Sequence, residues 1–115
     1  MTYEELVAEL KEAVKEADAS KIKEHAAFQF NVEGEGAGAL YLEIADGKVN
    51  VEPYEYYDRD ILVTTSAETL IRLVTGKLDP VKAYLEGKIR AEGNLGKASL
   101  LKELTSKKKG IFKRK

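Results

Sequence analysis

The chain contains no cysteine and only one histidine among its 115 residues. Without cysteine it can form neither a disulfide framework nor a thiolate metal site, and its redox compartment cannot be read from the sequence. A metal site would need carboxylates alone, and a nucleophile–histidine pair would depend on His25. We therefore expect no metal, no cofactor and no catalytic residue, and we interpret His25 as a residue at the surface or at the boundary of the first strand.

Long apolar runs are also absent. No stretch resembles a membrane span or a secretory signal, because the amphipathic, acidic segment 2–18 has no uninterrupted apolar core. With 43% hydrophobic and 34% charged residues, the composition is typical of a single folded domain. We expect a soluble, intracellular protein.

Positive charge is concentrated at the C-terminal end. Residues 1–104 hold all 20 acidic residues and 13 of the 19 basic ones, whereas residues 105–115 hold six basic residues and no acidic one. An acidic body is not typical of a nucleic-acid-binding domain, which carries positive charge on its folded surface. We therefore expect no nucleic-acid partner, and we divide the chain into a folded domain, 1–104, and a basic, flexible tail, 105–115.

The first half of the chain predicts one helix and three strands. Thr2 and Glu5 have the spacing of a capping box before an amphipathic segment that reaches about residue 18, and a short helical turn is expected at 19–24. Apolar residues then alternate with polar ones over 28–32, 40–44 and 49–51. The glycine-rich stretch 34–38 and Asp46-Gly47 separate these runs, so the pattern indicates an antiparallel meander.

The second half predicts two strands and three helices. Residues 61–65 have a strand pattern, and Thr65 or Ser66 caps a helix that ends near residue 76. Asp79-Pro80 begins a short helix that stops near residue 87, with Asp79 as N-cap and Pro80 in the first helical position. A fifth strand follows at 88–92 and a last helix at 95–104.

These elements predict an α+β domain with a five-stranded, mostly antiparallel sheet and helices covering one face. We expect the opposite face to be solvated. The polar residues assigned to it are Gln29, Asn31, Glu43, Arg90 and Glu92.

Three sequence motifs occur in order in the second half: Leu-Val-Thr-Gly-Lys-Leu-Asp-Pro at 73–80, Leu-Glu-Gly-Lys-Ile at 85–89 and Gly-Asn-Leu-Gly at 93–96. With Phe28-x-Phe30 and Asp46-Gly47-Lys48 upstream, they resemble the sterol carrier protein family, type 2. The likeness covers most of residues 3–104.

The resemblance implies a small α+β domain in which helices close over a five-stranded sheet around an apolar tunnel. Members of the family bind fatty acids, fatty acyl-CoA, phospholipids and sterols without catalysis. Peroxisomal members end in a signal of the Ser-Lys-Leu type, whereas this chain ends Lys113-Arg114-Lys115. We therefore expect a stand-alone, prokaryotic-like cytoplasmic protein, and an acyl chain rather than a sterol as its ligand.

The tunnel would lie between the apolar face of the sheet and the helices. Apolar periodicity alone does not separate a ligand pocket from a packed core, since both require the same residues at the same spacing. With the family resemblance, we expect the following residues to line the tunnel: Phe28, Phe30, Leu40, Leu42, Ile44, Val63, Leu70, Leu73, Val74, Tyr84, Ile89, Leu95, Leu101 and Leu104.

Two loops have alternative interpretations. The glycine-rich stretch 34–38 lies between strands and beside Glu33, so a hairpin loop is favoured over a phosphate site. Tyr54, Tyr56 and Tyr57 could form a contact surface, but we expect them to lie half-buried against the domain edge.

The tail has two interpretations. It could bind an anionic membrane, because its cations flank two apolar residues, or it could be a solvated segment. The residues assigned to membrane contact are Lys107, Lys108, Lys109, Ile111, Phe112, Lys113, Arg114 and Lys115.

The sequence favours a non-catalytic domain that binds and could transfer a long apolar lipid. The alternative is an accessory domain that contacts a partner enzyme through loop 54–57, the protein partner being unknown. An enzyme is disfavoured because the sequence offers no histidine–nucleophile pair, metal cluster or nucleotide fingerprint.

Overall fold

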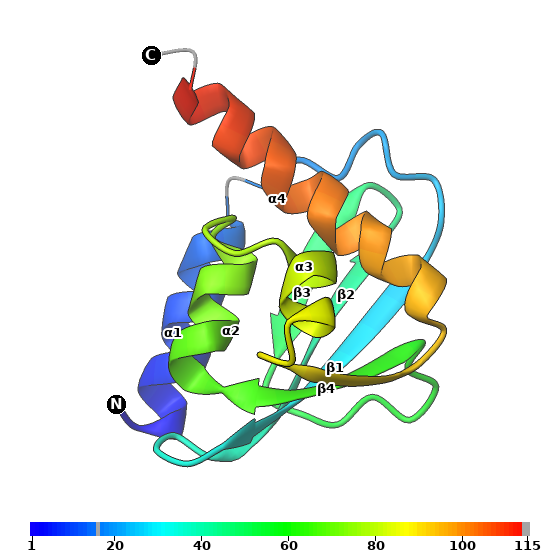
Figure 1. Cartoon of the computed structure of the whole chain (residues 1–115). Coiled ribbons are helices and arrows are strands. Elements are labelled where there is room, and N and C mark those ends of the chain that lie inside the picture. The colour runs from blue at the N-terminus through cyan, green and yellow to red at the C-terminus, as the bar shows by residue number, and fades with distance from the viewer. Residues whose placement is uncertain (16, 114–115) are drawn as a thin grey trace.

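The computed structural model describes the backbone of residues 1–15 and 17–113, and the side chains of these residues up to 105. In chain order, the elements are α1 (Tyr3–Val14), β1 (Ala26–Glu33), β2 (Gly38–Ala45), β3 (Lys48–Glu52), β4 (Ile61–Ser66), α2 (Ala67–Val74), α3 (Pro80–Leu85), β5 (Arg90–Gly93), the 3-10 helix η1 (Leu95–Lys97) and α4 (Ala98–Lys113). The strands form one sheet in the order β3-β2-β1-β4-β5, and the helices cover one face of it (Figure 1). The predicted α+β class is confirmed.

Strand β1 lies at the centre of the sheet. It pairs antiparallel with β2, and β2 pairs antiparallel with β3, which confirms the predicted meander. Asp46 and Gly47 have φ angles of 53° and 77°, which is the geometry of the tight turn that Asp-Gly favours between antiparallel strands. On its other side β1 pairs parallel with β4, and β5 completes the sheet antiparallel to β4.

Three of the predicted helix starts are confirmed by side-chain caps. The Thr2 hydroxyl accepts a hydrogen bond from the Glu5 N–H at 3.1 Å, and the Glu5 carboxylate accepts one from the Thr2 N–H at 2.8 Å. Ser66 caps α2 by accepting from the Thr69 N–H. Asp79 caps α3 by accepting from the N–H groups of Val81 and Lys82. Each cap satisfies backbone donors that have no partner inside the first helical turn.

Two boundaries in the first half differ from the prediction. Helix α1 ends at Val14 rather than near residue 18, and residues 19–24 form a turn and not a helix. The Asp18 carboxylate accepts a hydrogen bond from the Ser20 N–H at 2.9 Å. Such a local side-chain bond competes with helical hydrogen bonding, which explains why the helix prediction failed here.

Two boundaries in the second half also differ. Strand β5 covers Arg90–Gly93 and not 88–92, because the Lys88 N–H donates to the Ala83 carbonyl and completes the C-terminal turn of α3. The helix predicted at 95–104 is divided into η1 and α4, and α4 continues to Lys113. The flexibility expected of 105–115 stays a prediction.

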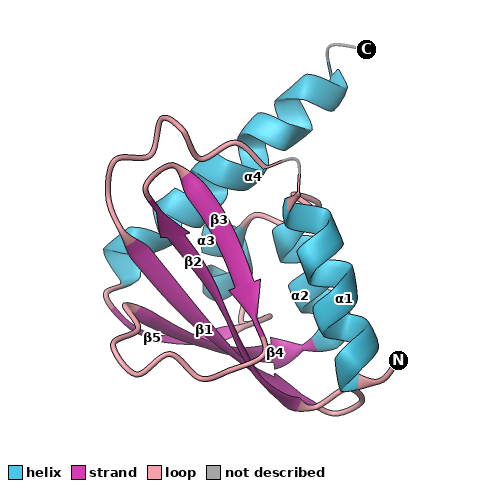
Figure 2. Ribbon diagram, turned by 180° about the vertical axis from the view of Figure 1, so that it is seen from behind, coloured by secondary structure: helices cyan, strands magenta, loops and turns pink. Residues whose placement is uncertain are grey.

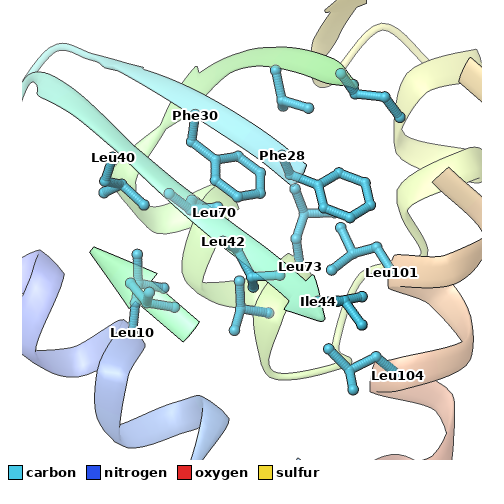
Figure 3. Packing of buried hydrophobic residues seen from close by; sticks show 14 of the residues in the cluster. Leu10, Phe28, Phe30, Leu40, Leu42, Ile44, Leu70, Leu73, Leu101 and Leu104 are labelled. Atoms are coloured by element: carbon cyan, nitrogen blue, oxygen red, sulfur yellow. The ribbon is translucent and has the colours of Figure 1, made fainter. Parts of the chain in front are cut away.

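The core lies between the sheet and the helices. Phe28 and Phe30 of β1 are buried with Leu40, Leu42 and Ile44 of β2, in the cluster that Figure 3 shows. Leu6 and Leu10 of α1, Leu70 and Leu73 of α2, and Leu101 and Leu104 of α4 cover this face of the sheet. The alternation of apolar residues along β2 therefore corresponds to a buried inner face, as expected for a half-buried strand.

The outer face of the sheet is less solvated than predicted. Gln29 is only 3% exposed, because the connection between β3 and β4 passes over this face (Figure 2). The Gln29 side-chain oxygen accepts hydrogen bonds from the Tyr56 N–H at 3.1 Å and from Arg59 at 3.3 Å. The other polar residues assigned to this face remain half-buried or exposed.

Lys97 joins the start of α4 to the sheet. Its Nζ donates to the His25 carbonyl at 2.7 Å and lies 3.3 Å from Oδ1 of Asp60. The other carboxylate oxygen of Asp60 accepts from the Ala27 N–H at 2.8 Å. The three segments that precede β1, β4 and α4 therefore meet at one partly buried ion pair.

We expect Gly76→Ala to destabilise the protein more than Gly87→Ala. Both glycines follow a helix with φ near +80°, a region that costs an L-residue about 1–2 kcal/mol. A Cβ at Gly76 would lie 2.9 Å from the Thr105 carbonyl oxygen, whereas a Cβ at Gly87 would have no atom within 4 Å. Urea denaturation should show about 1 kcal/mol of additional loss for Gly76→Ala. Equal losses would contradict this close approach of α2 to α4.

We expect Lys97→Met to lower the free energy of unfolding by about 2 kcal/mol, because it removes a charged donor and leaves Asp60 without its cation. The matched control is Lys88→Met, since the Lys88–Glu86 pair is exposed and its loss should cost less than about 0.5 kcal/mol. Urea denaturation compares the two variants. Hydrogen exchange should also become faster around η1 only in Lys97→Met, and a uniform profile would argue against this anchoring role.

Candidate functional site

An apolar pocket of about 250 Å³ lies at the β5 side of the sheet. Strands β1, β4 and β5 form its floor, and α2, α3, η1 and α4 surround it. Its lining residues are Phe28, Phe30, Ile61, Val63, Leu73, Pro80, Val81, Tyr84, Leu85, Ile89, Ala91, Leu95, Ala98 and Leu101.

The lining has almost no polar chemistry. The Tyr84 hydroxyl is the single polar side-chain group among the lining residues, and none of them is a carboxylate, an amine or an imidazole. An apolar chain can fill such a space without leaving a buried charge unpaired. The larger hollow beside α1 and β3 differs, because Lys11, Lys15, Lys48 and Glu52 line it.

Helix α3 forms one side of the pocket but packs lightly on the sheet. Pro80 and Ala83 are its buried residues, whereas Val81, Tyr84 and Leu85 are exposed to different degrees. A six-residue helix with two small buried side chains does not fill the space above β4 and β5. The pocket therefore remains open beneath it.

Asp79 fixes the start of α3. Its carboxylate accepts from the N–H groups of Val81 at 2.9 Å and Lys82 at 3.2 Å, and the Lys102 Nζ lies 3.1 Å from the other oxygen. Burial acts to raise the pKa of Asp79, but the hydrogen bonds from Lys102 and from the two backbone N–H groups outweigh it and lower that pKa. The ionised carboxylate thus joins α3 to α4.

The sequence motifs lie at the joints of this pocket. Gly76 ends α2 and Gly87 ends α3, both with positive φ angles. The Asn94 N–H, which follows β5, donates to the Asp60 carbonyl at 2.8 Å. The motif glycines and Asn94 therefore help to place α3 and β5. Five other motif residues line the pocket: Leu73, Pro80, Leu85, Ile89 and Leu95.

The structure divides the predicted tunnel residues into two groups. Eight line the pocket: Phe28, Phe30, Val63, Leu73, Tyr84, Ile89, Leu95 and Leu101. Six are buried in the core outside it: Leu40, Leu42, Ile44, Leu70, Val74 and Leu104. In Figure 3, Leu40 lies on the side of Leu10 of α1, and Ile44 lies beside Leu104 of α4. Ligand contact by either group stays a prediction.

Six lining residues were not predicted: Ile61, Pro80, Val81, Leu85, Ala91 and Ala98. A period of two relates Ile61 to Val63 and Ala91 to Ile89, so the strand pattern could have identified both. On α3, Val81 lies three residues before the predicted Tyr84, so the helical period could have identified it as well.

The remaining candidate residues lie away from the pocket. His25 is at the surface, where its Nε2 lies 2.7 Å from Oε2 of Glu43, and the Tyr56 hydroxyl donates to the same oxygen at 2.9 Å. That hydrogen bond to Glu43 raises the pKa of Tyr56. Tyr56 is half-buried against Tyr41 with an edge-to-face geometry. Tyr54 and Tyr57 are exposed, so the expectation of half-burial is wrong for these two.

The glycine-rich stretch forms the connection between β1 and β2, as the hairpin interpretation expected. In the part of the chain that the structure describes, no group of three or more potential ligands could hold a metal ion. Within the same residues, no helix has the length and hydropathy needed to span a bilayer. The side chains assigned to membrane contact, from residue 107 on, lie outside the described side chains.

Comparison with known proteins identifies the family. A model described as the SCP-2 sterol transfer family matches residues 6–106. The hydroxysteroid dehydrogenase-like protein 2 of Bos taurus is 30% identical over 80 residues, which cover 69% of this chain and 19% of that protein. The chain thus spans less than a fifth of the first curated relatives.

Two solved structures show the same fold. The palmitated SCP2L2 of Aedes aegypti is 22% identical with a TM-score of 0.63, over 91% of this chain and 95% of that one. The UbiJ-SCP2 ubiquinone synthesis protein is 16% identical with a TM-score of 0.66, over 90% of this chain and 92% of that one. The chain belongs to the SCP-2 sterol transfer family, in which the domain binds or transfers apolar lipids.

Proposed function

We propose that the chain binds the hydrocarbon chain of one fatty acid or fatty acyl ester in this pocket, without chemical turnover, and carries it in the cytoplasm. The observation that supports this proposal most directly is the lining, in which every residue is apolar except for the Tyr84 hydroxyl. A carboxylate or ester headgroup would have no charged partner inside the pocket. It would therefore remain at the mouth in contact with water.

The size of the pocket favours one linear chain over a sterol. A volume of about 250 Å³ lies below the roughly 300–1,000 Å³ of pockets that enclose drug-sized ligands. At about 30 Å³ per group, the volume that liquid water occupies per molecule, it holds on the order of eight methylenes. A fused four-ring sterol is larger than this volume, so more of it would lie outside the mouth. The palmitated state of the Aedes aegypti protein supports the choice of an acyl chain.

The energy of burial indicates how a longer chain would be held. On the order of eight methylenes gain about 6 kcal/mol on leaving water. Lost translational and rotational freedom removes at least about 4 kcal/mol of this gain. The enclosed part of a chain therefore binds weakly by itself, and the exposed apolar residues at the mouth must cover further methylenes for micromolar affinity.

The same lining argues against turnover. General acid–base or nucleophilic catalysis needs a titratable or nucleophilic group within hydrogen-bond reach of the substrate. The lining offers the Tyr84 hydroxyl alone, and His25 lies on the outer face of the sheet beside Glu43. Binding and release are the steps that these residues support.

A second candidate function is an accessory domain that serves a partner enzyme. Tyr54 and Tyr57 are 64% and 94% exposed on the connection between β3 and β4, and aromatic residues are enriched at protein interfaces. The first curated relatives are also several times longer than the matched region. A pull-down that recovers a stoichiometric protein and no lipid would favour this function over lipid carriage.

We expect affinity to depend on chain length in two regimes. From hexanoate upward, each added methylene that the pocket encloses should lower the dissociation constant about fourfold. This regime should end at on the order of eight methylenes. Longer chains up to palmitate should gain less per methylene, because the rest lies on the half-exposed mouth. Displacement of a fluorescent fatty acid from delipidated protein measures the series. A fourfold gain that continues to palmitate would contradict the size limit, and no dependence would contradict apolar binding.

We expect Ala91→Phe to weaken fatty-acid binding about tenfold or more while the protein remains folded. Ala91 lies on β5 opposite Val63 and lines the pocket, so a phenyl ring there would occupy ligand space. The matched control is Ala45→Phe on β2, which does not line the pocket. Circular dichroism and urea denaturation check the fold of both variants. If Ala91→Phe binds as well as the control, the ligand lies elsewhere.

A further inference from the structure

Exposed apolar side chains gather at the mouth of the pocket. Among the described residues, seven large hydrophobic side chains are exposed, and four of them line the pocket: Val81, Tyr84, Leu85 and Leu95. We refer to these four residues as the apolar rim. Leu85, at the end of α3, is 76% exposed. A group of exposed apolar residues around a pocket indicates an interaction surface rather than ordinary solvent-exposed surface.

Among the residues whose side chains are described, the rim belongs to a stretch in which basic residues outnumber acidic ones. Residues 77–105 hold six basic and four acidic residues, whereas residues 1–76 hold seven basic and sixteen acidic residues. Two of the four acids near the rim are already paired, Asp79 with Lys102 and Glu86 with Lys88. Arg90 pairs with Glu33 and Lys97 with Asp60, so four of the six basic residues are in ion pairs and Lys77 and Lys82 are left.

Two exposed lysines of this region are available to an anion. Lys77 and Lys82 form no ion pair with any described residue. Lys82 lies on α3, three residues before Leu85, so the helix presents the two side chains on the same side. In Figure 1, α3 stands in front of the sheet between α2 and α4, with α1 on the far side of α2. The first turn of α1 is acidic, with Glu4 and Glu5.

We propose that the apolar rim docks on an anionic lipid bilayer, with Leu85 inserted at the interface and Lys77 and Lys82 facing the lipid headgroups. The inference rests on the proposed function, because a hydrocarbon chain that leaves the bilayer through this mouth is never exposed to water. An apolar anchor together with basic residues is the combination that holds peripheral proteins on membranes. A protein partner would not account for the coincidence of the rim with the pocket mouth.

A single fluorescent label at the rim tests the insertion. Because the chain has no cysteine, Leu85→Cys provides a unique attachment site for an environment-sensitive fluorophore. With vesicles of equal parts phosphatidylcholine and phosphatidylserine, its emission should shift to the blue and be quenched by a lipid-bound quencher. Tyr57→Cys, a position that is 94% exposed and outside the pocket lining, is the matched control and should not respond. A response at both positions, or at neither, would overturn the proposal.

Neutral substitutions of Lys77 and Lys82 test whether their positive charge contributes to membrane binding. Lys77→Gln with Lys82→Gln should weaken vesicle sedimentation about fivefold per lysine at low salt. Lys11→Gln with Lys48→Gln removes the same charge from α1 and β3, at the opposite edge of the sheet, and should have little effect. Equal losses in the two pairs, or loss only when residues 106–115 are deleted, would overturn docking through the rim.

Fatty-acid binding is also measured without vesicles, so that a loss of membrane docking can be distinguished from a loss of ligand binding. Neither lysine pair lines the pocket, so both double variants should bind a fluorescent fatty acid as the parent protein does. Insertion of the Leu85→Cys label without any fatty-acid binding would support docking and contradict the proposed ligand. Fatty-acid binding without insertion would overturn docking and leave the ligand in place.

Discussion

The site depends on how little of α3 is buried. Toward the other edge of the sheet, long side chains of α1 and β2 are buried in the core, with Leu6, Leu10, Leu40 and Leu42 each at most 1% exposed. Above β4 and β5, a six-residue helix contributes Pro80 and Ala83, and the facing positions Ala91 and Ala98 are also small. Close packing is the usual state of a protein interior. Where side chains do not pack closely, an apolar space remains, and such a space favours a hydrocarbon ligand over water.

Polar contacts between segments hold this region in place. Asp79 joins the start of α3 to Lys102 of α4, and Lys97 joins the start of α4 to Asp60 and the His25 carbonyl. A helix that buries little apolar surface gains little stability from packing. Its position therefore depends on caps, turns and ion pairs, which is consistent with the motif residues Gly76, Asp79 and Gly87 at the ends of α2 and α3. Low local stability is also what a ligand mouth requires if a chain is to enter and leave.

The features predicted correctly are those with a local cause. The Thr2–Glu5 capping box, the Asp46-Gly47 turn and the Asp79-Pro80 helix start involve neighbours within a few residues. The features predicted wrongly depend on tertiary contacts or on local hydrogen bonds that compete with helix formation. Gln29 is buried because a distant connection covers it, and residues 19–24 follow a side-chain turn at Asp18 instead of a helix. A strand pattern identifies the inner face but contains no information about what covers the outer one.

By itself, the sequence determined the fold class, the order of the elements and the local caps and turns, because capping, turn formation and hydrophobic periodicity act over short stretches of chain. It also placed Phe28 and Leu40 on the same apolar face, and both are buried there. Only the tertiary structure decided that Phe28 lines a pocket whereas Leu40 packs against α1. The two residues have the same pattern and the same transfer free energy out of water per area buried. They differ in the helices that face them. The positions of these helices depend on contacts between segments that are far apart in the sequence.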